Sequence, residues 1–209
     1  MRLSIAKATA FGIVLSAAFT THIASNCRLP AYAGTTDTSV RKEIQGMPVK
    51  SAHEQIGKTT FVVSKTVVKA PPEKVFHVLT DYQNAPRIFS NLTSCKVLKE
   101  EPGRKIVKFG AKVAGNLWKF DYVLALTEKS PQRIEWKRVS GAFKANEGFW
   151  QLDPIEGGKA TAVTYAKHID GGLFFPKALV LKTIESTVPT IFAELTSVAE
   201  SPTLAISKK

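Results

Sequence analysis

The chain has 209 residues, and its 29 lysines and arginines exceed its 17 acidic residues by a formal net charge of +12 at pH 7. The basic residues are scattered, in no block longer than two, which fits a solvated basic surface or contact with an anionic membrane surface and disfavours a nucleic-acid site. Two cysteines exclude a disulfide-rich scaffold, and the length suits one domain held by its own core.

The first 33 residues have the layout of a secretory signal. Arg2 and Lys7 flank the start of a mostly apolar stretch over residues 8–24, and Ala31-Tyr32-Ala33 offers small residues for cleavage. A membrane anchor is the alternative, but it needs about 20 apolar residues, and polar residues between positions 20 and 26 interrupt this stretch. We therefore predict a signal peptide over 1–33 and export to the periplasm, a lumen or the extracellular space.

Residues 34–58 contain no aromatic side chain and are rich in polar residues, so they cannot bury enough surface to offset chain entropy. We interpret them as a flexible leader. Residues 59–70 follow as the first strand. Pro71 and Pro72 then end that strand and begin a helix, because proline lacks an N–H but fits the first helical turn. A second short helix is expected after Asp81.

The middle of the chain predicts a succession of strands. Turn residues such as Pro102-Gly103 and Ser140-Gly141 separate the segments, and such short connections favour hairpins and an antiparallel sheet. The six further predicted strands span residues 92–98, 105–113, 117–127, 133–139, 143–152 and 161–168.

From Leu181 to Val198, apolar residues recur at intervals of three and four, which predicts one long helix. Pro189 lies inside this pattern, so a kink is expected near Glu185. A sheet and a helix that each have one apolar face must pack together. The prediction is an α+β helix-grip domain over residues 59–200, with about seven strands curved around the C-terminal helix, two short helices after the first strand, and a tail over 201–209.

Alternation along the predicted strands places large aromatic side chains on the inner face. In the strand over 117–127, Trp118, Phe120 and Tyr122 share one face while Lys119 and Asp121 share the other. The same parity turns Trp136 and Arg138 inward in the next strand, and Trp150, Asn146 and Gly148 inward in the one after it. Such aromatics either fill the core or line an apolar ligand pocket. Arg138 lies either at the wet mouth of a cavity or, if the parity is shifted by one, on the surface.

Signatures of enzymes and metal sites are mostly missing. The chain has no nucleophile elbow, no glycine-rich phosphate loop and no metal-ligand spacing, so we name no catalytic residue, no metal and no cofactor. His168 and Asp170 form either a base with its orienting partner or, more simply, a polar cluster at the end of a strand.

Five segments carry a resemblance to a known family: VKAPPEKVF (68–76), LTDY (79–82), GFWQLDP (148–154), TAVTY (161–165) and VPTIF (188–192). Together they resemble the polyketide cyclase/dehydrase and lipid-transport group of the START-like, Bet v 1-like superfamily, and within it the coenzyme Q-binding START-like branch. The resemblance implies a helix-grip fold with a hydrophobic cavity between sheet and long helix. It also implies a lipid, quinone, polyketide or similar ligand, usually without a metal, and no shared catalytic residues.

The leading functional hypothesis is an exported monomer that binds or carries a hydrophobic small molecule in this cavity, with peripheral contact to an anionic membrane and no nucleic-acid partner. The alternative is a cyclase, aromatase or dehydratase in which Arg138, Tyr122 or His168 acts on a polyketide-like substrate. The predicted ligand-binding residues are Trp118, Phe120, Tyr122, Trp136, Arg138, Trp150, Tyr165 and Phe192.

Overall fold

The computed structural model describes residues 49–113 and 117–202. The predicted signal peptide, residues 34–48 of the predicted leader and residues 203–209 of the predicted tail lie outside the described residues. Within those that are described, no helix is long and apolar enough to cross a membrane.

One antiparallel sheet of eight strands forms the framework of the domain. Its order is β1-β2-β8-β7-β6-β5-β4-β3, so β2 and β8 pair as the second and third strands from one edge although they lie far apart in the sequence. The strands are β1 (Ser51–Ile56), β2 (Thr59–Val68), β3 (Leu92–Glu101), β4 (Arg104–Val113), β5 (Trp118–Lys129), β6 (Arg133–Gly141), β7 (Ala145–Ile155) and β8 (Ala160–Asp170). The sheet and its helix confirm the predicted helix-grip architecture, with eight strands in place of about seven.

The additional strand, β1, lies in the range predicted as flexible leader, and that part of the prediction is wrong. The aromatic-poor composition suggested that this segment buries too little surface to order. It is instead held by a backbone ladder to β2 across the two-residue turn at Gly57, whose φ is +62°. A hydrogen bond of 2.9 Å between His53 Nε2 and Glu185 Oε1 adds a contact to the C-terminal helix.

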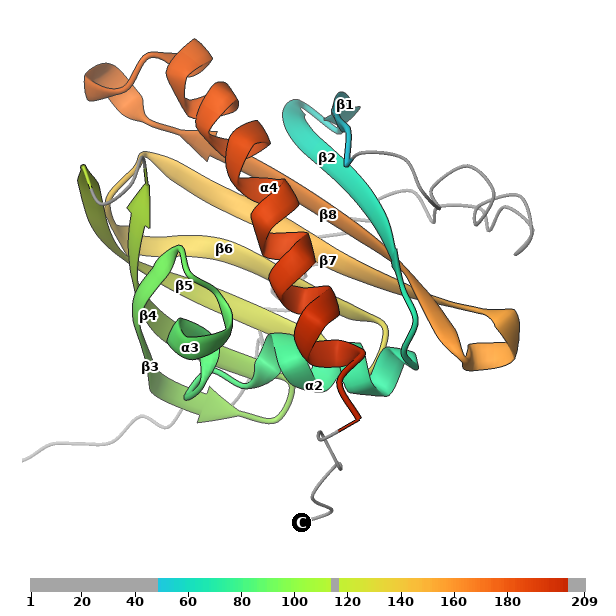
Figure 1. Ribbon diagram of the computed structural model, residues 1–209. Helices are drawn as coiled ribbons and strands as arrows, with labels where there is room; N and C mark the ends of the chain where they lie inside the picture. Colours follow the sequence, from blue (N-terminus) through green and yellow to red (C-terminus); the bar gives the residue numbers. More distant parts are fainter. Residues whose placement is uncertain (1–48, 114–116, 203–209) are drawn as a thin grey trace, which may run out of the picture. The chain divides into compact units, whose positions relative to one another are not determined.

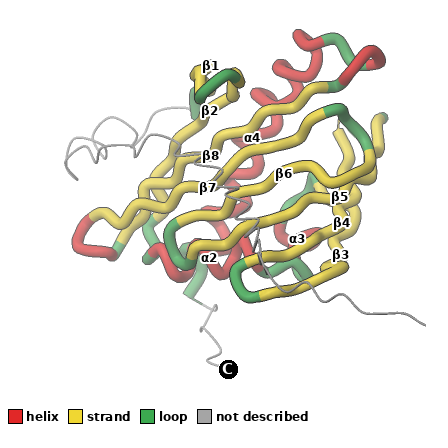
Figure 2. The backbone as a smooth tube through the Cα atoms, turned by 180° about the vertical axis from the view of Figure 1, so that it is seen from behind, coloured by secondary structure: helices red, strands yellow, loops and turns green. Residues whose placement is uncertain are grey.

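The helices gather on one face of the sheet. α2 (Pro72–Thr80) and α3 (Ala85–Ile88) lie at one end, and α4 (Lys177–Ala199) crosses the face diagonally (Figure 1). Figure 2 shows the opposite face, with α4 behind the strands. Two short 3-10 helices, η1 (Glu156–Gly158) and η2 (Gly172–Phe174), flank β8.

The start of α2 and the apolar face of α4 lie where the sequence predicted them. Pro72 opens α2, and Glu73 lies in its first turn, where a negative charge complements the helix dipole. α4 continues through Pro189 as one helix from Lys177 to Ala199, and the kink predicted near Glu185 stays a prediction. Every third or fourth residue of α4 turns to the sheet, and the buried set is Val180, Ile184, Val188, Ile191, Phe192, Leu195 and Ala199.

Candidate ligand-binding cavities

A largely apolar cavity lies between the sheet and the first half of α4. The empty space between its lining atoms is about 940 Å³, including solvent at its opening. Strands β4, β5, β7 and β8 line one side, and α4 lines the other with apolar residues and two threonines. The aromatic part of the lining is Trp118, Phe120, Tyr122, Phe143, Tyr165 and Phe175. We call this the first cavity.

A second cavity lies toward α2 and α3, with an empty space of about 770 Å³ on the same measure. Leu79 of α2, Tyr82, and Ala85 of α3 close it on one side, so the two short helices that the sequence predicted do border the ligand space. Six residues line both cavities: Asn91, Tyr122, Asn146, Tyr165, Lys167 and Ile191. We call this shared region the junction.

Most of the predicted binding residues lie on the inner face of the sheet, where the alternation of side chains along the strands placed them. Trp118 and Phe120 line the first cavity, Trp136 and Trp150 line the second, and Tyr122 and Tyr165 line both. The rings contact one another: the centroid of Trp150 lies 4.3 Å from that of Tyr165 and 6.0 Å from that of Phe192. Phe192 itself is 1% exposed and supports these rings from α4 without appearing in either lining.

Arg138 is the predicted binding residue that the structure places apart from both cavities. It pairs with Leu124 of β5, so the predicted inward parity is kept in the ladder. Its guanidinium, however, donates hydrogen bonds to the carbonyl oxygens of Gly141 (2.8 Å) and Ala142 (3.4 Å) in the β6–β7 turn. The side chain therefore fixes a turn, and neither cavity includes it in its lining.

His168 and Asp170 do not act on each other. His168 Nδ1 lies 2.9 Å from the carbonyl oxygen of Thr60, and its ring packs against Phe61 with centroids 5.9 Å apart. Asp170 accepts a hydrogen bond from the backbone N–H of Gly172 and lies 3.7 Å from Lys144 Nζ. Each residue is therefore engaged by partners of its own, and neither lines a cavity.

Lys167 is the functional candidate that the sequence reasoning missed. It lies at the junction, two residues after Tyr165 on β8, and it is the one charged residue in either lining within the described part of the chain. The residue is partly exposed, and burial of the ammonium lowers the pKa of Lys167 to about 8. The missed signal was the parity of β8: Tyr165 was placed inward, and the same alternation carries Lys167 with it.

The other polar groups near the junction are neutral. Burial raises the pKa of the Tyr122 and Tyr165 hydroxyls above the usual range, so both remain protonated phenols at neutral pH. Asn146 Oδ1 accepts a hydrogen bond of 3.2 Å from the indole N–H of Trp136. Asn91 Oδ1 is buried and has no hydrogen-bond partner among the described residues. Asn91 and Lys167 therefore bring free hydrogen-bonding capacity to the junction, as do the Tyr122 and Tyr165 hydroxyls, for which no partner is found among the described residues.

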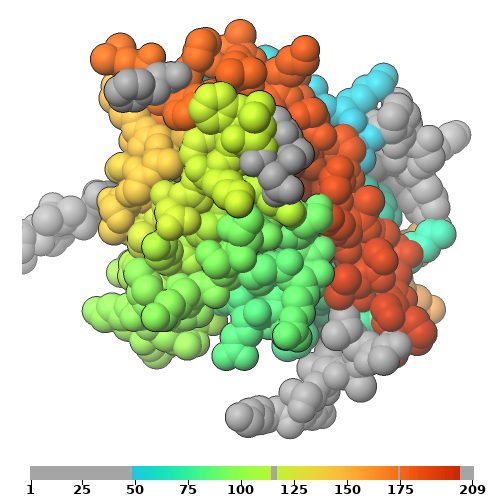
Figure 3. All heavy atoms as spheres, turned by 60° about the vertical axis from the view of Figure 1, so that its left-hand side comes forward, coloured from blue at the N-terminus to red at the C-terminus, as the bar shows by residue number. Residues whose placement is uncertain are grey.

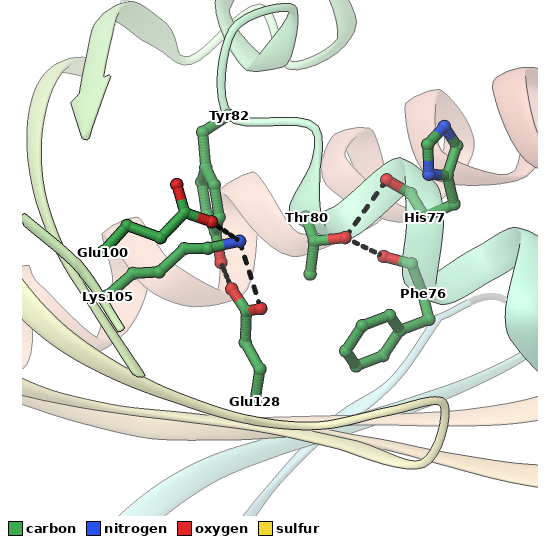
Figure 4. A network of polar contacts seen from close by, with 7 residues as sticks. All are labelled: Phe76, His77, Thr80, Tyr82, Glu100, Lys105 and Glu128. Carbon is green, nitrogen blue, oxygen red and sulfur yellow. Dashed lines mark hydrogen bonds and ion pairs between the residues drawn. The ribbon is translucent and has the colours of Figure 1, made fainter. Parts of the chain in front are cut away.

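A polar network fastens the segment after α2 to the sheet (Figure 4). The Tyr82 hydroxyl donates a hydrogen bond of 2.6 Å to Glu128 Oε1 on β5. Lys105 Nζ lies 3.2 Å from the other oxygen of Glu128 and 3.3 Å from Glu100. It also lies 5.2 Å from the centre of the Tyr82 ring. Because Tyr82 lines the second cavity, this network closes that end of the ligand space.

The opposite end, beside the first cavity, exposes apolar side chains. Leu117 directly precedes β5 and Trp118 begins it. Leu173 lies in η2 and Leu179 at the start of α4. We call these four residues the apolar rim. They are 75%, 48%, 101% and 52% exposed, respectively. Trp118 contacts Phe175 edge-to-face at 5.9 Å, which joins the two segments, and Figure 3 shows the start of β5 beside the start of α4. Exposed Lys119, Lys177 and Lys182 flank the rim.

Within residues 49–113 and 117–202, no three histidine, cysteine, aspartate or glutamate side chains lie close enough to hold a metal ion together.

Comparison with known proteins gives one family and many structural neighbours. Residues 68–196 match the family model described as polyketide cyclase / dehydrase and lipid transport. No curated protein matched the chain.

Three solved structures illustrate the structural likeness. A START superfamily protein from Mycobacterium smegmatis has 17% identity and a TM-score of 0.60, covering 67% of this chain and 97% of that one. A STAR-related lipid transfer protein from Xanthomonas axonopodis has 17% identity and a TM-score of 0.59, with coverage of 74% and 100%. The Zhui aromatase/cyclase from Streptomyces sp. R1128 has 15% identity and a TM-score of 0.55, with coverage of 66% and 90%. At these identities the likeness shows the fold.

Proposed function

This chain belongs to the polyketide cyclase/dehydrase and lipid transport family, and from this premise we propose that it is an exported binder or carrier of a hydrophobic small molecule. The observation that carries the proposal is the aromatic, largely apolar lining of the two adjoining cavities beneath α4. Ligand pockets typically combine such a lining with a few polar anchors. Burial of apolar ligand surface contributes about 25 cal/mol per Å², so a lipid, quinone or isoprenoid-like tail suits this space. A quinone or isoprenoid-like ligand would agree with the resemblance of the sequence to the coenzyme Q-binding START-like branch.

Contact with a membrane is the second part of the proposal. The apolar rim lies at the end of the first cavity, and two of its members, Trp118 and Leu179, also line that cavity. Exposed aromatic and leucine side chains flanked by lysines suit the interface of an anionic bilayer, where each nearby lysine contributes about 1 kcal/mol. A ligand could then pass between the bilayer and the cavity without crossing open water.

A cyclase, aromatase or dehydratase is the competing function, because family members and fold neighbours include such enzymes by name. It would need a polar group positioned on the substrate. Of the three groups considered from sequence, Arg138 is bonded to turn carbonyls and His168 to the backbone of Thr60, which leaves the Tyr122 hydroxyl. This placement favours the carrier.

Native mass spectrometry of the protein purified from its own host, followed by organic extraction, tests the carrier function. We expect a bound hydrophobic molecule and displacement of a lipophilic dye by the extract. Ala111→Phe, which fills the first cavity, should weaken dye binding, whereas Ala125→Phe on the next strand, with opposite parity to the buried Leu124 and Leu126, should not. Protein that is reproducibly empty and binds no dye would refute the proposal.

A further inference from the structure

The ammonium of Lys167 lies in an apolar space without a counter-charge. Among the described residues, it has no hydrogen-bond or ion-pair partner, and neither lining contains an aspartate, glutamate, histidine or arginine. An unpaired buried charge is strongly unfavourable, and proteins generally pair or hydrate it. The position of Lys167 therefore calls for an anion supplied from outside the chain.

No element that lines the junction brings a negatively charged group to it. α4 presents apolar residues and the threonines Thr183 and Thr187. The sheet and the α2–α3 segment present the hydroxyls of Tyr122, Tyr165 and Tyr82, whose pKa values burial raises, so none of them becomes an anion at neutral pH. No negatively charged group in either lining competes with a ligand for the ammonium.

Asn91 provides an independent observation at the same place. Its Oδ1 is buried without a partner, and the residue lines both cavities as Lys167 does. A buried acceptor without a donor is unfavourable, and a hydroxyl on the ligand, beside its acid group, would satisfy it. Polar groups without a partner thus lie at the junction, and the cavities on either side of it are largely apolar.

We propose that the ligand is an amphipathic acid, whose carboxylate pairs with Lys167 at the junction while its apolar part occupies the aromatic cavities. This inference rests on the proposed carrier function and narrows it to one ligand class. Apolar burial supplies affinity, and the single ammonium sets the position and polarity of the bound molecule.

Isothermal titration with dodecanoate and with dodecanol tests the inference, because the two probes differ in the charged group alone. We expect dodecanoate to bind the wild-type protein more tightly than dodecanol. Lys167→Met, of similar length and without charge, should weaken dodecanoate binding by about 10- to 100-fold, the range of a charge-assisted hydrogen bond, and leave dodecanol binding within about threefold. Lys137→Met, an exposed lysine on β6, is the matched control and should change neither.

The two proposals fail in different ways. Wild-type protein that binds both probes equally, with no effect of Lys167→Met, overturns the acid inference and leaves the carrier function intact. Protein that binds neither probe nor a lipophilic dye overturns both proposals. Loss of both probes in Lys167→Met, in a variant that is still folded by circular dichroism, would show a role in shaping the cavity and would also overturn the inference.

A pH series provides a second readout. Dodecanoate affinity should change little below about pH 7, begin to fall as the pH approaches 8, and fall toward tenfold per pH unit above it as Lys167 loses its proton, since its pKa lies at about 8 before binding. Dodecanol affinity should stay flat over the same range. A fall that is equal for both probes would contradict an ion pair.

Discussion

The indole ring of Trp136 lies directly over Gly148 of the neighbouring strand, so close that a Cβ atom on this glycine would overlap Trp136 Cζ2 and the carbonyl oxygen of Ala166. The glycine gives Trp136 room to lie flat against the sheet and to reach Asn146 with its N–H. Tyr165 stacks on the same indole at 5.8 Å. The wall of the second cavity therefore depends on residue 148 being glycine.

Gly148→Ala should destabilise the protein, because neither the backbone of β8 nor a buried indole can move away cheaply. Overpacking of this kind costs about 1–3 kcal/mol in free energy of unfolding, and chemical denaturation measures it. Gly110→Ala is the contrasting variant: its Cβ would meet the terminal hydroxyl oxygens of Ser94 and Thr93, which can rotate away. Equal losses in the two variants would argue against the tight packing of Trp136.

Tyr82→Phe should loosen the end of the domain that carries α2 and α3. The variant loses the hydrogen bond to Glu128, while Glu128 keeps its contact with Lys105. We expect a loss of about 1 kcal/mol in free energy of unfolding and faster amide hydrogen exchange over residues 80–91. Gln83→Ala, at the exposed neighbouring position, is the control. Unchanged exchange in Tyr82→Phe would mean that the network does not hold this segment.

Pro189→Ala should stabilise α4. Proline has no N–H to donate to the carbonyl of Glu185, and the residue is exposed, so alanine restores a helical hydrogen bond without disturbing the core. The gain should be about 1–3 kcal/mol, seen as a higher thermal midpoint. Thr190→Ala, also exposed on α4, should have a much smaller effect. A lower midpoint for Pro189→Ala would show that the helix needs the distortion that proline imposes.

The stability of the protein should rise with pH above about 8 through Lys167. Its pKa is about 8 in the folded protein, whereas an exposed lysine titrates near about 10.4. Between these values the unfolded chain binds more protons than the folded one, so the free energy of unfolding rises by up to about 1.4 kcal/mol per pH unit.

Lys167→Met should remove this rise, and the difference between variant and wild type isolates it from the titration of other groups. Urea denaturation at several pH values from 7 to 10 measures both proteins, with Lys137→Met as the control. Parallel curves for wild type and Lys167→Met would contradict the buried position of the ammonium.

The sequence predicted most of the framework because its signals are local. Alternation in β5 and β7 turned the right aromatic residues inward, the double proline marked the change from β2 to α2, and the periodic stripe from Leu181 to Val198 marked α4. The β1 hairpin was missed because composition alone cannot reveal a backbone ladder to a neighbouring strand or a contact such as His53 with Glu185.

Parity, chain order and the inward aromatic face were thus determined by the sequence alone, since each depends on the geometry of a few consecutive residues. The tertiary structure decided which charged side chain belongs to the site. Arg138 and Lys167 both carry inward parity, yet the carbonyls of the β6–β7 turn engage Arg138, while Lys167 meets no partner in either lining. The physical reason is that the cost of a buried charge depends on groups brought together from distant parts of the chain, which no local pattern contains.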